Sequence, residues 1–243
     1  MSRFYVRPAD VHKGEIIVTK EEARHIACVM RMAAGDRIVA FDGTGKEYVG
    51  RIVAVRRGHV RIAVDEERLI REEAGTRVSL AQALPKRQTM DMIVEKATEL
   101  GVAEITPVVT DRTVVRLDPG GRDAKRERWQ KIALSASKQC GRADIPAVRP
   151  VSTFADILGG ARGYDAAMMA CLAEDTRPLK EVIPDIQGKK ILVMVGPEGD
   201  FSPAEIKAAA ASGCILVSLG KRVLRVETAA LYILSVMDYE GSV

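Results

Sequence analysis

Two glycine-containing segments in the last third of the chain have the residue types of ligand-binding loops. Gly196–Gly199 follows the apolar run Ile191–Val195, and Leu219-Gly220 follows a second apolar run. Glycine lets the backbone approach a ligand closely, and N–H groups at such turns can bind it directly. Ser202, with Glu205 three residues later, predicts a capping box that begins a helix. Each segment alone fits an ordinary strand-to-helix turn equally well, because glycine is common there.

Other catalytic patterns find little support. Neither segment has the spacing G-x-G-x-x-G or G-x-x-x-x-G-K-[ST], so nothing favours pyrophosphate binding. A cysteine–histidine nucleophilic site is disfavoured in the later part of the chain, because His12, His25 and His59 all lie within the first 60 residues. The cysteines are widely scattered without a C-x-x-C pair: Cys28, Cys140, Cys171 and Cys214. They predict buried thiols in a reducing cytosol, with no disulfide and no metal site.

A basic segment, Ser137–Arg142, ends a predicted helix at Gly141. Cations near a helix C-terminus stabilise the helix, so capping explains Lys138 and Arg142 as well as phosphate binding does. Further cations that can extend a phosphate-facing surface are Lys86, Arg87, Arg112 and Arg116. Residues 76–150 carry 14 basic against 9 acidic side chains, whereas residues 151–243 carry 9 against 12. The middle third is therefore the part best suited to a polyanion, with a solvated surface as the plainer alternative.

Strands and helices alternate from residue 76 onward, which predicts an α/β domain with a mostly parallel sheet. Strands are predicted at 77–84, 105–110, 165–171, 191–195 and 215–219, and helices at 91–100, 123–140, 203–212 and 227–239. Pro107 predicts an edge or irregular position for its strand. Because ligands bind at the carboxyl ends of parallel strands, both glycine segments lie where a cofactor would bind.

The first 70 residues have the pattern of a small β-barrel or sandwich. Val60, Ile62 and Val64 alternate with other residues, as in a half-buried strand. Strands are predicted at 3–6, 37–42, 48–56 and 59–65, with a helix at 21–32. The polar stretch 66–75 is the predicted linker, and we divide the chain into domains 1–72 and 73–243.

The composition excludes several classes of protein. With 243 residues, 47% hydrophobic and 29% charged, the chain suits a globular fold and neither disorder nor a collagen-like repeat. Its longest apolar runs are far shorter than the roughly 20 residues that span a bilayer. Polar residues interrupt the first positions, so we expect no secretory signal and a cytoplasmic location.

Several motifs occur together in a fixed order. The cofactor-loop candidates are Gly196–Gly199, Leu219-Gly220 and Leu224–Ala229. Further motifs are Arg3-Phe4-Tyr5, His25 with Met30-Arg31, Lys96–Gly101 and Gln139–Arg142. Together they resemble the SPOUT methyltransferases, and more narrowly the bacterial ribosomal small-subunit methyltransferase E family, over nearly the whole chain. Asp200 and Val226 depart from the common family pattern, which has glycine and threonine at these positions.

The resemblance implies a PUA-like β-barrel followed by an α/β domain with a C-terminal trefoil knot. It implies a homodimer with the active site at the dimer interface, S-adenosylmethionine (SAM) as methyl donor, and no metal. The implied reaction is methylation of N3 of a specific uridine in 16S rRNA, with the rRNA or the small ribosomal subunit as partner. The implied cofactor-binding residues are Leu172, Ala173, Gly196, Pro197, Glu198, Gly199, Leu219, Gly220, Leu224, Arg225, Glu227, Thr228 and Ala229. The implied RNA-binding residues are Arg3, Arg7, His25, Arg31, Lys86, Arg87, Arg112, Arg116, Lys138, Gln139 and Arg142.

Two residues of these loops are candidate catalytic groups, Arg225 and Glu198. Methyl transfer is an in-line displacement, so orientation of the reactants is the main task of the enzyme. The uridine N3 proton must leave, and a cation such as Arg225, or one from the region of the partner's Arg142, would stabilise the resulting anion. Glu198 and Glu227 are candidate bases by residue type. We favour a structural role for both, because loop carboxylates commonly accept hydrogen bonds from the backbone.

Other functions remain open. A SPOUT methyltransferase acting on tRNA ribose or guanine is one alternative, although the barrel-first order and Gln139–Arg142 favour rRNA. A non-catalytic RNA-binding protein, with the α/β domain used only for dimerisation, is a second alternative, and it would not bind SAM. A nucleotide-dependent enzyme is disfavoured by the absence of a phosphate loop.

Overall fold

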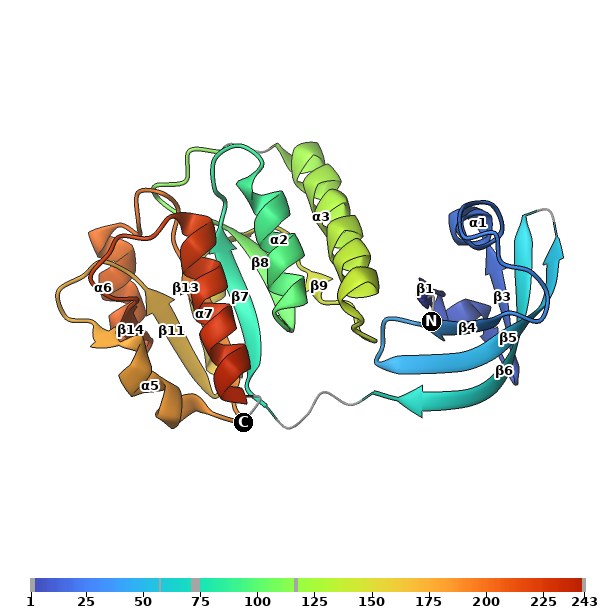
Figure 1. The fold of residues 1–243 in the computed structure, drawn as a ribbon. Coiled ribbons are helices and arrows are strands. Elements are labelled where there is room, and N and C mark those ends of the chain that lie inside the picture. Colours follow the sequence, from blue (N-terminus) through green and yellow to red (C-terminus); the bar gives the residue numbers. More distant parts are fainter. Residues whose placement is uncertain (1–2, 57, 71–74, 116–117, 242–243) are drawn as a thin grey trace. The chain divides into compact units, whose positions relative to one another are not determined.

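The computed structural model describes residues 3–56, 58–70, 75–115 and 118–241, and the chain divides into two compact units (Figure 1). The first unit contains Met1–Glu72 together with Ser137–Ile145, and the second contains Glu73–Ala136 and Pro146–Val243. None of the described helices is both long and apolar enough to cross a membrane.

The first unit is built on a six-stranded sheet with the order β1-β4-β5-β6-β3-β2. Neighbouring strands are antiparallel, apart from β1 and β4, which run parallel. Ile16, Ile38 and Ile62 are buried in its core, because alternate side chains of a strand share one face. The strands are β1 (Arg3–Tyr5), β2 (Val11–His12), β3 (Glu15–Thr19), β4 (Arg37–Phe41), β5 (Lys46–Arg56) and β6 (His59–Leu69).

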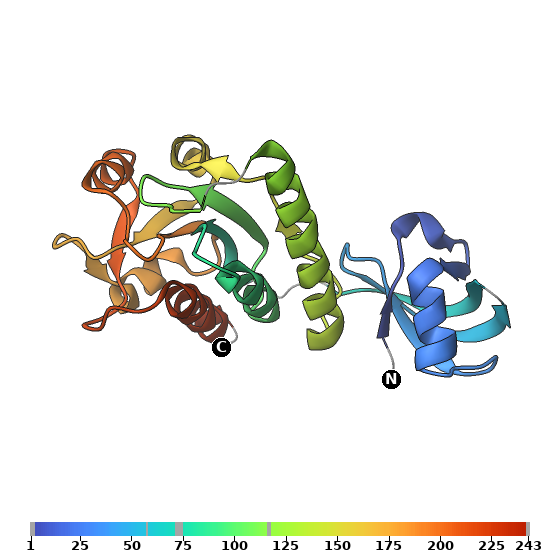
Figure 2. The same ribbon diagram turned by 90° about the horizontal axis from the view of Figure 1, so that it is seen from above.

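Several segments of this unit differ from the sequence prediction. β2 and β3 were not predicted, and β6 continues to Leu69 through residues assigned to the linker. The charged end of β6 stays paired with β5, and Lys46 Nζ lies 2.7 Å from Glu67 Oε1. The predicted helix 21–32 is a short α1 (Lys20–Arg24) followed by a π-helical turn, η2 (His25–Val29), which Figure 2 shows lengthwise beside the sheet. A 3₁₀ turn, η1 (Pro8–Asp10), precedes β2.

Residues Ser137–Ile145 pack with the first unit, although the sequence division at residue 72 places them in the second domain. The N–H of Gly45 donates to Ala143 O at 3.1 Å, and the N–H of Ile145 donates to Gly43 O at 3.2 Å. Lys138 Nζ also lies 2.8 Å from Glu22 Oε1. Backbone pairing and an ion pair therefore tie this segment to residues 98 to 116 positions earlier, a relation that local sequence patterns do not contain.

The second unit contains a parallel sheet with the order β10-β8-β7-β13-β11-β14-β12, in which β9 also pairs with β8. Every pair of neighbouring strands runs parallel, which confirms the predicted parallel α/β arrangement. The strands are β7 (Arg77–Ala83), β8 (Glu104–Val109), β9 (Ala147–Val148), β10 (Ser152–Thr153), β11 (Ala166–Ala170), β12 (Arg177–Pro178), β13 (Lys190–Val195) and β14 (Ile215–Ser218).

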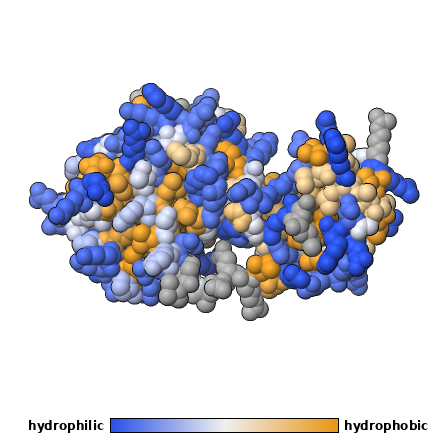
Figure 3. All heavy atoms as spheres, in the orientation of Figure 1, coloured by the Kyte–Doolittle hydropathy of each residue, from blue (hydrophilic) through white to orange (hydrophobic). Residues whose placement is uncertain are grey.

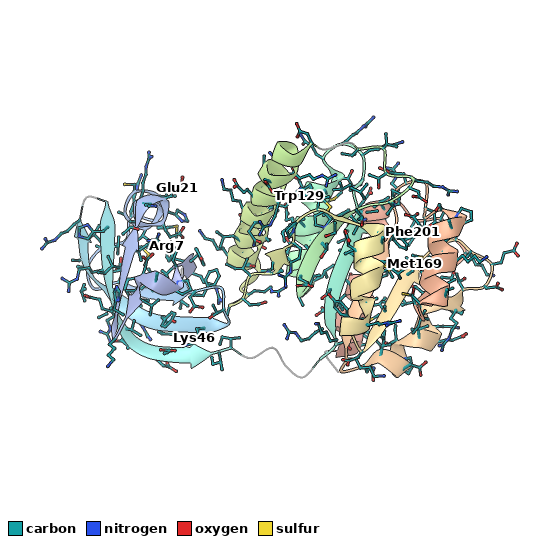
Figure 4. The ribbon with its side chains drawn as sticks, turned by 180° about the vertical axis from the view of Figure 1, so that it is seen from behind. Arg7, Glu21, Lys46, Trp129, Met169 and Phe201 are labelled. Atoms are coloured by element: carbon teal, nitrogen blue, oxygen red, sulfur yellow. The ribbon has the colours of Figure 1, made fainter. Side chains whose placement is uncertain are left out.

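Helices cover both faces of this sheet. On one face α2 and α7 pack against each other and α7 also packs on β7 and β13 (Figure 1). On the other face Phe201 and Met169 belong to a cluster that includes residues of α4 and α6 (Figure 4). The helices are α2 (Thr89–Glu99), α3 (Pro119–Cys140), α4 (Phe154–Gly160), η3 (Ala161–Gly163), α5 (Leu179–Ile186), α6 (Pro203–Ala211) and α7 (Val226–Gly241). α5 was not predicted, and Pro184 inside it explains why.

Pro107 lies in an interior strand of the sheet, β8, where the sequence predicts an edge or irregular position. β8 pairs with β7 along its length, and Gln82 lies opposite Pro107. On its other side β9 pairs with Glu104 and Ile105, and β10 pairs with Val108 and Val109. Within the described residues, Thr106 and Pro107 fall in the gap between these two short strands. The strand is interior, but at Pro107 it is locally an edge, which is where proline is tolerated.

Glu104 of β8 binds the side chains of Arg149, which follows β9, and Tyr164, which precedes β11. Removal of its carboxylate is therefore expected to destabilise the second unit. Its Oε2 accepts hydrogen bonds from Arg149 Nε at 2.9 Å and Nη2 at 2.7 Å, and its Oε1 accepts one from the Tyr164 hydroxyl at 2.9 Å. Partial burial raises the pKa of Glu104, but these hydrogen bonds outweigh it and leave the pKa below its ordinary value. The stabilisation is therefore present above the unfolded-state pKa of about 4.3 and is lost as the pH falls through the lower folded-state value.

We expect Glu104→Gln to lower the free energy of unfolding by about 1–2 kcal/mol at pH 7, measured by urea denaturation. The difference from the unaltered protein should be smaller at pH 3.5, because this pH lies below the unfolded-state pKa of about 4.3, where the stabilisation begins to be lost. Glu181→Gln, which removes an exposed carboxylate of α5, is the matched control and should change little at either pH. An equal loss for Glu104→Gln at both pH values would contradict this account.

Candidate functional site

A cavity of about 540 Å³ opens at the carboxyl ends of β11, β13 and β14 in the second unit. Its wall is formed by residues from the exits of these strands and by Lys86, Arg87 and Thr89, which follow β7. Small-molecule sites commonly have volumes of roughly 300–1,000 Å³. The cavity is thus large enough for a cofactor and lies at the edge of the sheet where the sequence predicts one.

The exit of β13 is held in place by the carboxylate of Glu198 and by Arg112. Glu198 Oε1 accepts a hydrogen bond from the backbone N–H of Lys86 at 2.8 Å. Arg112 Nη1 donates to the carbonyl oxygen of Gly199 at 2.6 Å. The turn that begins at Gly196 is therefore tied to the segments that follow β7 and β8, and Glu198 contributes as a backbone acceptor.

The predicted capping box at the start of α6 is confirmed. Ser202 Oγ accepts from the N–H of Glu205 at 3.2 Å, and Glu205 Oε2 accepts from the N–H of Ser202 at 2.8 Å. Glu205 is buried, and its Oε1 also accepts from the N–H of Asp111 at 3.0 Å. One carboxylate thus fixes both the first turn of α6 and the segment after β8, and the glycine turn between β13 and α6 has anchored ends.

The segment between β14 and α7 forms the opposite wall of the cavity. Gly220 has φ of 112°, a conformation that side chains rarely adopt, and its N–H donates to Ser218 Oγ at 3.3 Å. Val223 and Arg225 line the cavity, and Arg225 immediately precedes the first residue of α7. The positive end of the α7 dipole therefore adds to the charge of the Arg225 guanidinium at the cavity wall.

The structure brings most of the predicted cofactor residues together. Those that line the cavity are Leu172, Gly196, Pro197, Glu198, Leu219, Gly220, Leu224, Arg225, Glu227 and Ala229. Ala173, Gly199 and Thr228 belong to the same segments but do not form its wall. Arg222, Val223 and Val226 also line it, between the predicted residues Leu219 and Ala229. Lining residues that the sequence prediction missed are Thr89, Ala170, Cys171, Val195, Asp200 and Ser218. Most of them adjoin predicted residues, so extending each motif to its flanking positions would have found them.

Cys171 lines this cavity, and the prediction that all four cysteines are buried is wrong for Cys28 and Cys140. Those two are exposed, since they lie on the outer side of η2 and in the last turn of α3. Burial raises the pKa of the Cys171 thiol above its ordinary value, with the Ala173 N–H partly offsetting and the Asp200 charge adding to the effect. Burial likewise raises the pKa of Cys214.

In the native protein we therefore expect the thiols of Cys28 and Cys140 to react quickly and those of Cys171 and Cys214 to react slowly. The thiolate is the reactive form, so a raised pKa and burial both slow the reaction of Cys171 and Cys214 at pH 7.5. Titration with a chromogenic disulfide should release two equivalents quickly and four in denaturant. The double variant Cys28→Ser, Cys140→Ser should lose the fast phase, and a fast phase that survives in it would contradict the assignment.

Many of the predicted RNA-binding cations are already engaged within their own unit. Arg3 forms an ion pair with Glu47 and lies over the ring of Phe41, 4.8 Å from its centroid. Arg7 lies 2.7 Å from Asp10, and Arg142 lies 2.5 Å from Asp144. These cations position the first unit's own loops and strands, so their charges are partly neutralised.

Other predicted RNA-binding residues are differently placed. The ring of His25 meets Phe4 edge-on, and Lys138 is paired with Glu22. Arg31 and Gln139 are exposed. Arg112 holds Gly199, and Arg116 lies outside the described residues. Lys86 and Arg87 line the cavity together with Arg222 and Arg225, so four cations are gathered at one site. This basic rim is the strongest feature for binding a phosphate backbone in the second unit.

Comparison with known proteins identifies the family. Residues 72–238 match the model of an RNA methyltransferase domain, and residues 18–65 match an RNA methyltransferase PUA domain. The chain is 33% identical to ribosomal RNA small subunit methyltransferase E of Bacillus subtilis, over 92% of this chain and 89% of the relative. It is 29% identical to the protein of that name from Synechocystis, over 93% of this chain and 74% of the relative.

A solved structure agrees with the sequence relatives. The crystal structure of a ribosomal RNA small subunit methyltransferase E from Neisseria gonorrhoeae, bound to S-adenosyl methionine, superposes with a TM-score of 0.85. It is 29% identical in sequence, and the match covers 99% of this chain and 98% of that one. The first unit is thus a PUA domain and the second an RNA methyltransferase domain, and the chain belongs to the ribosomal RNA small subunit methyltransferase E family.

Proposed function

We propose that this protein is a SAM-dependent methyltransferase that methylates N3 of a specific uridine in the 16S rRNA of the small ribosomal subunit. The observation that carries the proposal is the cavity at the carboxyl ends of β11, β13 and β14. The structure of this chain matches that of the relative from Neisseria gonorrhoeae, which is bound to SAM. The match covers 99% of this chain and 98% of that one.

The residues of the cavity fit SAM. Its volume of about 540 Å³ suits a molecule of that size, and the side chains of Leu172, Val223 and Leu224 offer an apolar wall for the adenine ring. Gly196 and Gly220 line the cavity: a Cβ at Gly196 would press on Phe201 of the same turn, and the φ of 112° at Gly220 disfavours a side chain there, so glycine keeps both segments in place. SAM supplies a methyl group on a sulfonium. The task of the protein is to hold that methyl in line with the uridine nitrogen.

Arg225 is the residue we assign to stabilisation of the uridine anion. Its side chain is exposed at the cavity wall, and it has no hydrogen bond or ion pair with any other described side chain. It also precedes the first residue of α7, whose positive dipole end adds to its charge. When the N3 proton leaves, negative charge spreads over the uracil ring, and a fixed cation beside it lowers the cost.

Glu198 is expected to act as a backbone acceptor and not as the base that takes the N3 proton. Its Oε1 is occupied by the N–H of Lys86. Glu198→Gln keeps an acceptor at that position, so kcat should stay within about threefold of the unaltered protein. Glu198→Ala leaves the N–H without its acceptor and should weaken SAM binding by about fivefold to tenfold, measured by calorimetry. A loss of kcat of about a hundredfold or more in Glu198→Gln would show general-base catalysis instead.

The proposal includes a homodimer, a C-terminal trefoil knot and action in the cytoplasm. Support for the dimer comes from apolar side chains exposed on the face of α2 and α7, where Met92 is 43%, Tyr232 44% and Tyr239 71% exposed. Figure 3 shows several apolar patches, separated by polar residues, on this side of the second unit. Exposed aromatic and methionine side chains are enriched in protein interfaces. Sedimentation equilibrium should give twice 26.4 kDa, and a monomer at micromolar concentration would contradict the dimer.

Mapping of modified nucleosides after deletion of the gene tests the reaction. We expect 3-methyluridine to disappear from 16S rRNA and to return when the gene is restored. Retention of 3-methyluridine together with loss of a methylated tRNA nucleoside would favour a tRNA enzyme. Retention without any loss, in a protein that does not bind SAM, would favour a non-catalytic RNA-binding protein.

A further inference from the structure

Asp200 has a left-handed backbone conformation. Its φ is 61°, in the region that glycine adopts without steric cost and that, among other residues, asparagine and aspartate adopt most readily. Its own N–H donates to the carbonyl oxygen of Pro197 at 3.0 Å and closes the turn after β13. A glycine would satisfy this turn, so the aspartate side chain needs a separate explanation.

The carboxylate of Asp200 reaches the exit of the neighbouring strand. Its Oδ2 accepts a hydrogen bond from the backbone N–H of Leu172 at 2.9 Å. β11 and β13 pair up to Ala170 and Val195, and the N–H of Cys171 still donates to Val217 O at 3.2 Å. Leu172 is the next residue. Its N–H donates to the Asp200 carboxylate, whereas the N–H of Cys171 still donates to a backbone carbonyl of the neighbouring strand.

Both partners of this hydrogen bond line the cavity. Leu172 is 65% exposed there, and burial against other side chains therefore does little to hold it. The turn that carries Asp200 is itself anchored, because Glu198 accepts the N–H of Lys86 and Arg112 donates to Gly199. A rigid turn thus holds the first residue of a weakly packed segment by one side-chain contact.

We propose that Asp200 is a positioning residue for the cofactor: its carboxylate holds Leu172 at the cavity wall in the arrangement that binds SAM. This inference rests on the proposed function, because it assumes that the cavity binds SAM. Asp200 acts through Leu172, and the contribution of its side chain is to binding more than to stability.

Two substitutions separate positioning from stability. Asp200→Gly relieves the left-handed conformation and removes the acceptor, so we expect SAM affinity to fall about tenfold while the thermal midpoint stays equal or rises. Asp200→Asn keeps a side-chain oxygen and tolerates positive φ, so affinity should stay within about threefold. Asp175→Asn, which removes an exposed carboxylate three residues beyond Leu172, is the charge control and should bind SAM normally.

Calorimetry and thermal unfolding of the full chain provide the readouts, with methyl-transfer kinetics as a third. Asp200→Gly should raise the KM for SAM about tenfold while kcat changes less than twofold. Normal SAM affinity in Asp200→Gly would overturn the inference and leave the proposed function intact. A lower thermal midpoint with a matching loss of affinity in Asp200→Gly would also overturn it, since the role would then be structural. Absence of SAM binding by the unaltered protein would overturn the inference and the proposed function together.

Discussion

Gly196→Val is expected to weaken SAM binding by about fivefold to 150-fold. A Cβ at this position would lie 3.2 Å from Cδ2 and Cε2 of Phe201 and 3.3 Å from the backbone carbon of Asp200. Phe201 is buried in the cluster beneath the turn, so it has little room to move, and the branched methyls of valine increase the crowding. Overpacking of this kind costs typically about 1–3 kcal/mol, and here the turn that forms the cavity wall must shift to relieve it.

The matched control is Gly159→Val in α4. A Cβ there would meet no other atom within 4 Å, so the same substitution should leave SAM affinity within about twofold. Calorimetry measures the affinity, and circular dichroism checks that both variants remain folded. Normal SAM binding by folded Gly196→Val would place the cofactor outside this cavity.

Arg225→Ala is expected to lower kcat by about a hundredfold to a thousandfold while SAM affinity changes less than fivefold. The guanidinium stands at the cavity wall beside the first turn of α7, where charge on the uracil ring would develop. Arg225→Lys keeps a cation but not the planar fork of donors, so it should recover part of the loss. Single-turnover methyl transfer to small ribosomal subunits, with SAM saturating, isolates this step.

Lys221→Ala is the control for general loss of positive charge near the RNA. Lys221 is exposed four residues before Arg225 and does not line the cavity. Its removal should weaken RNA binding slightly and leave kcat unchanged. Equal loss of kcat in both variants would assign Arg225 to RNA attraction, and full activity of Arg225→Ala would remove it from the mechanism.

Local sequence patterns were sufficient to locate the cavity in outline. The continuous apolar run at 191–195 and the glycine turn after it identified β13 and its exit, and the Ser202–Glu205 pattern identified the start of α6. These features depend on residues close together in the chain. The position of Pro107 was also informative, because the loss of one N–H marked the place where β8 lacks a neighbour on one side.

Long-range partners were not predictable from one sequence. The hydrogen bond of Glu198 with Lys86 joins residues 112 positions apart, and that of Asp200 with Leu172 joins residues 28 positions apart. The residues that flank Glu198 and Asp200 in the sequence do not distinguish these carboxylates from ones exposed to solvent. For the same reason the ion pair of Arg3 with Glu47, which links β1 to β5, was not foreseen, and the role of Arg3 in RNA binding stays a prediction.

The assignment of Ser137–Ile145 shows the same limit. Its first four residues complete α3, and the residues after Gly141 give no sign that Asp144 bridges to Gly43 and Thr44. The identity of the methylated atom is likewise beyond local pattern. The uridine N3 was inferred from the family resemblance. The match of residues 72–238 and the curated relatives confirm the family.

The most direct test of the central claim is methyl transfer in vitro to small ribosomal subunits from cells that lack this gene. The subunits are incubated with the purified protein and isotopically labelled SAM, and the 16S rRNA is digested to nucleosides for mass spectrometry. The account predicts that the label appears as 3-methyluridine, at one position, and not with Gly196→Val. Label in another nucleoside, or no label in 16S rRNA from an active SAM-binding preparation, would contradict it.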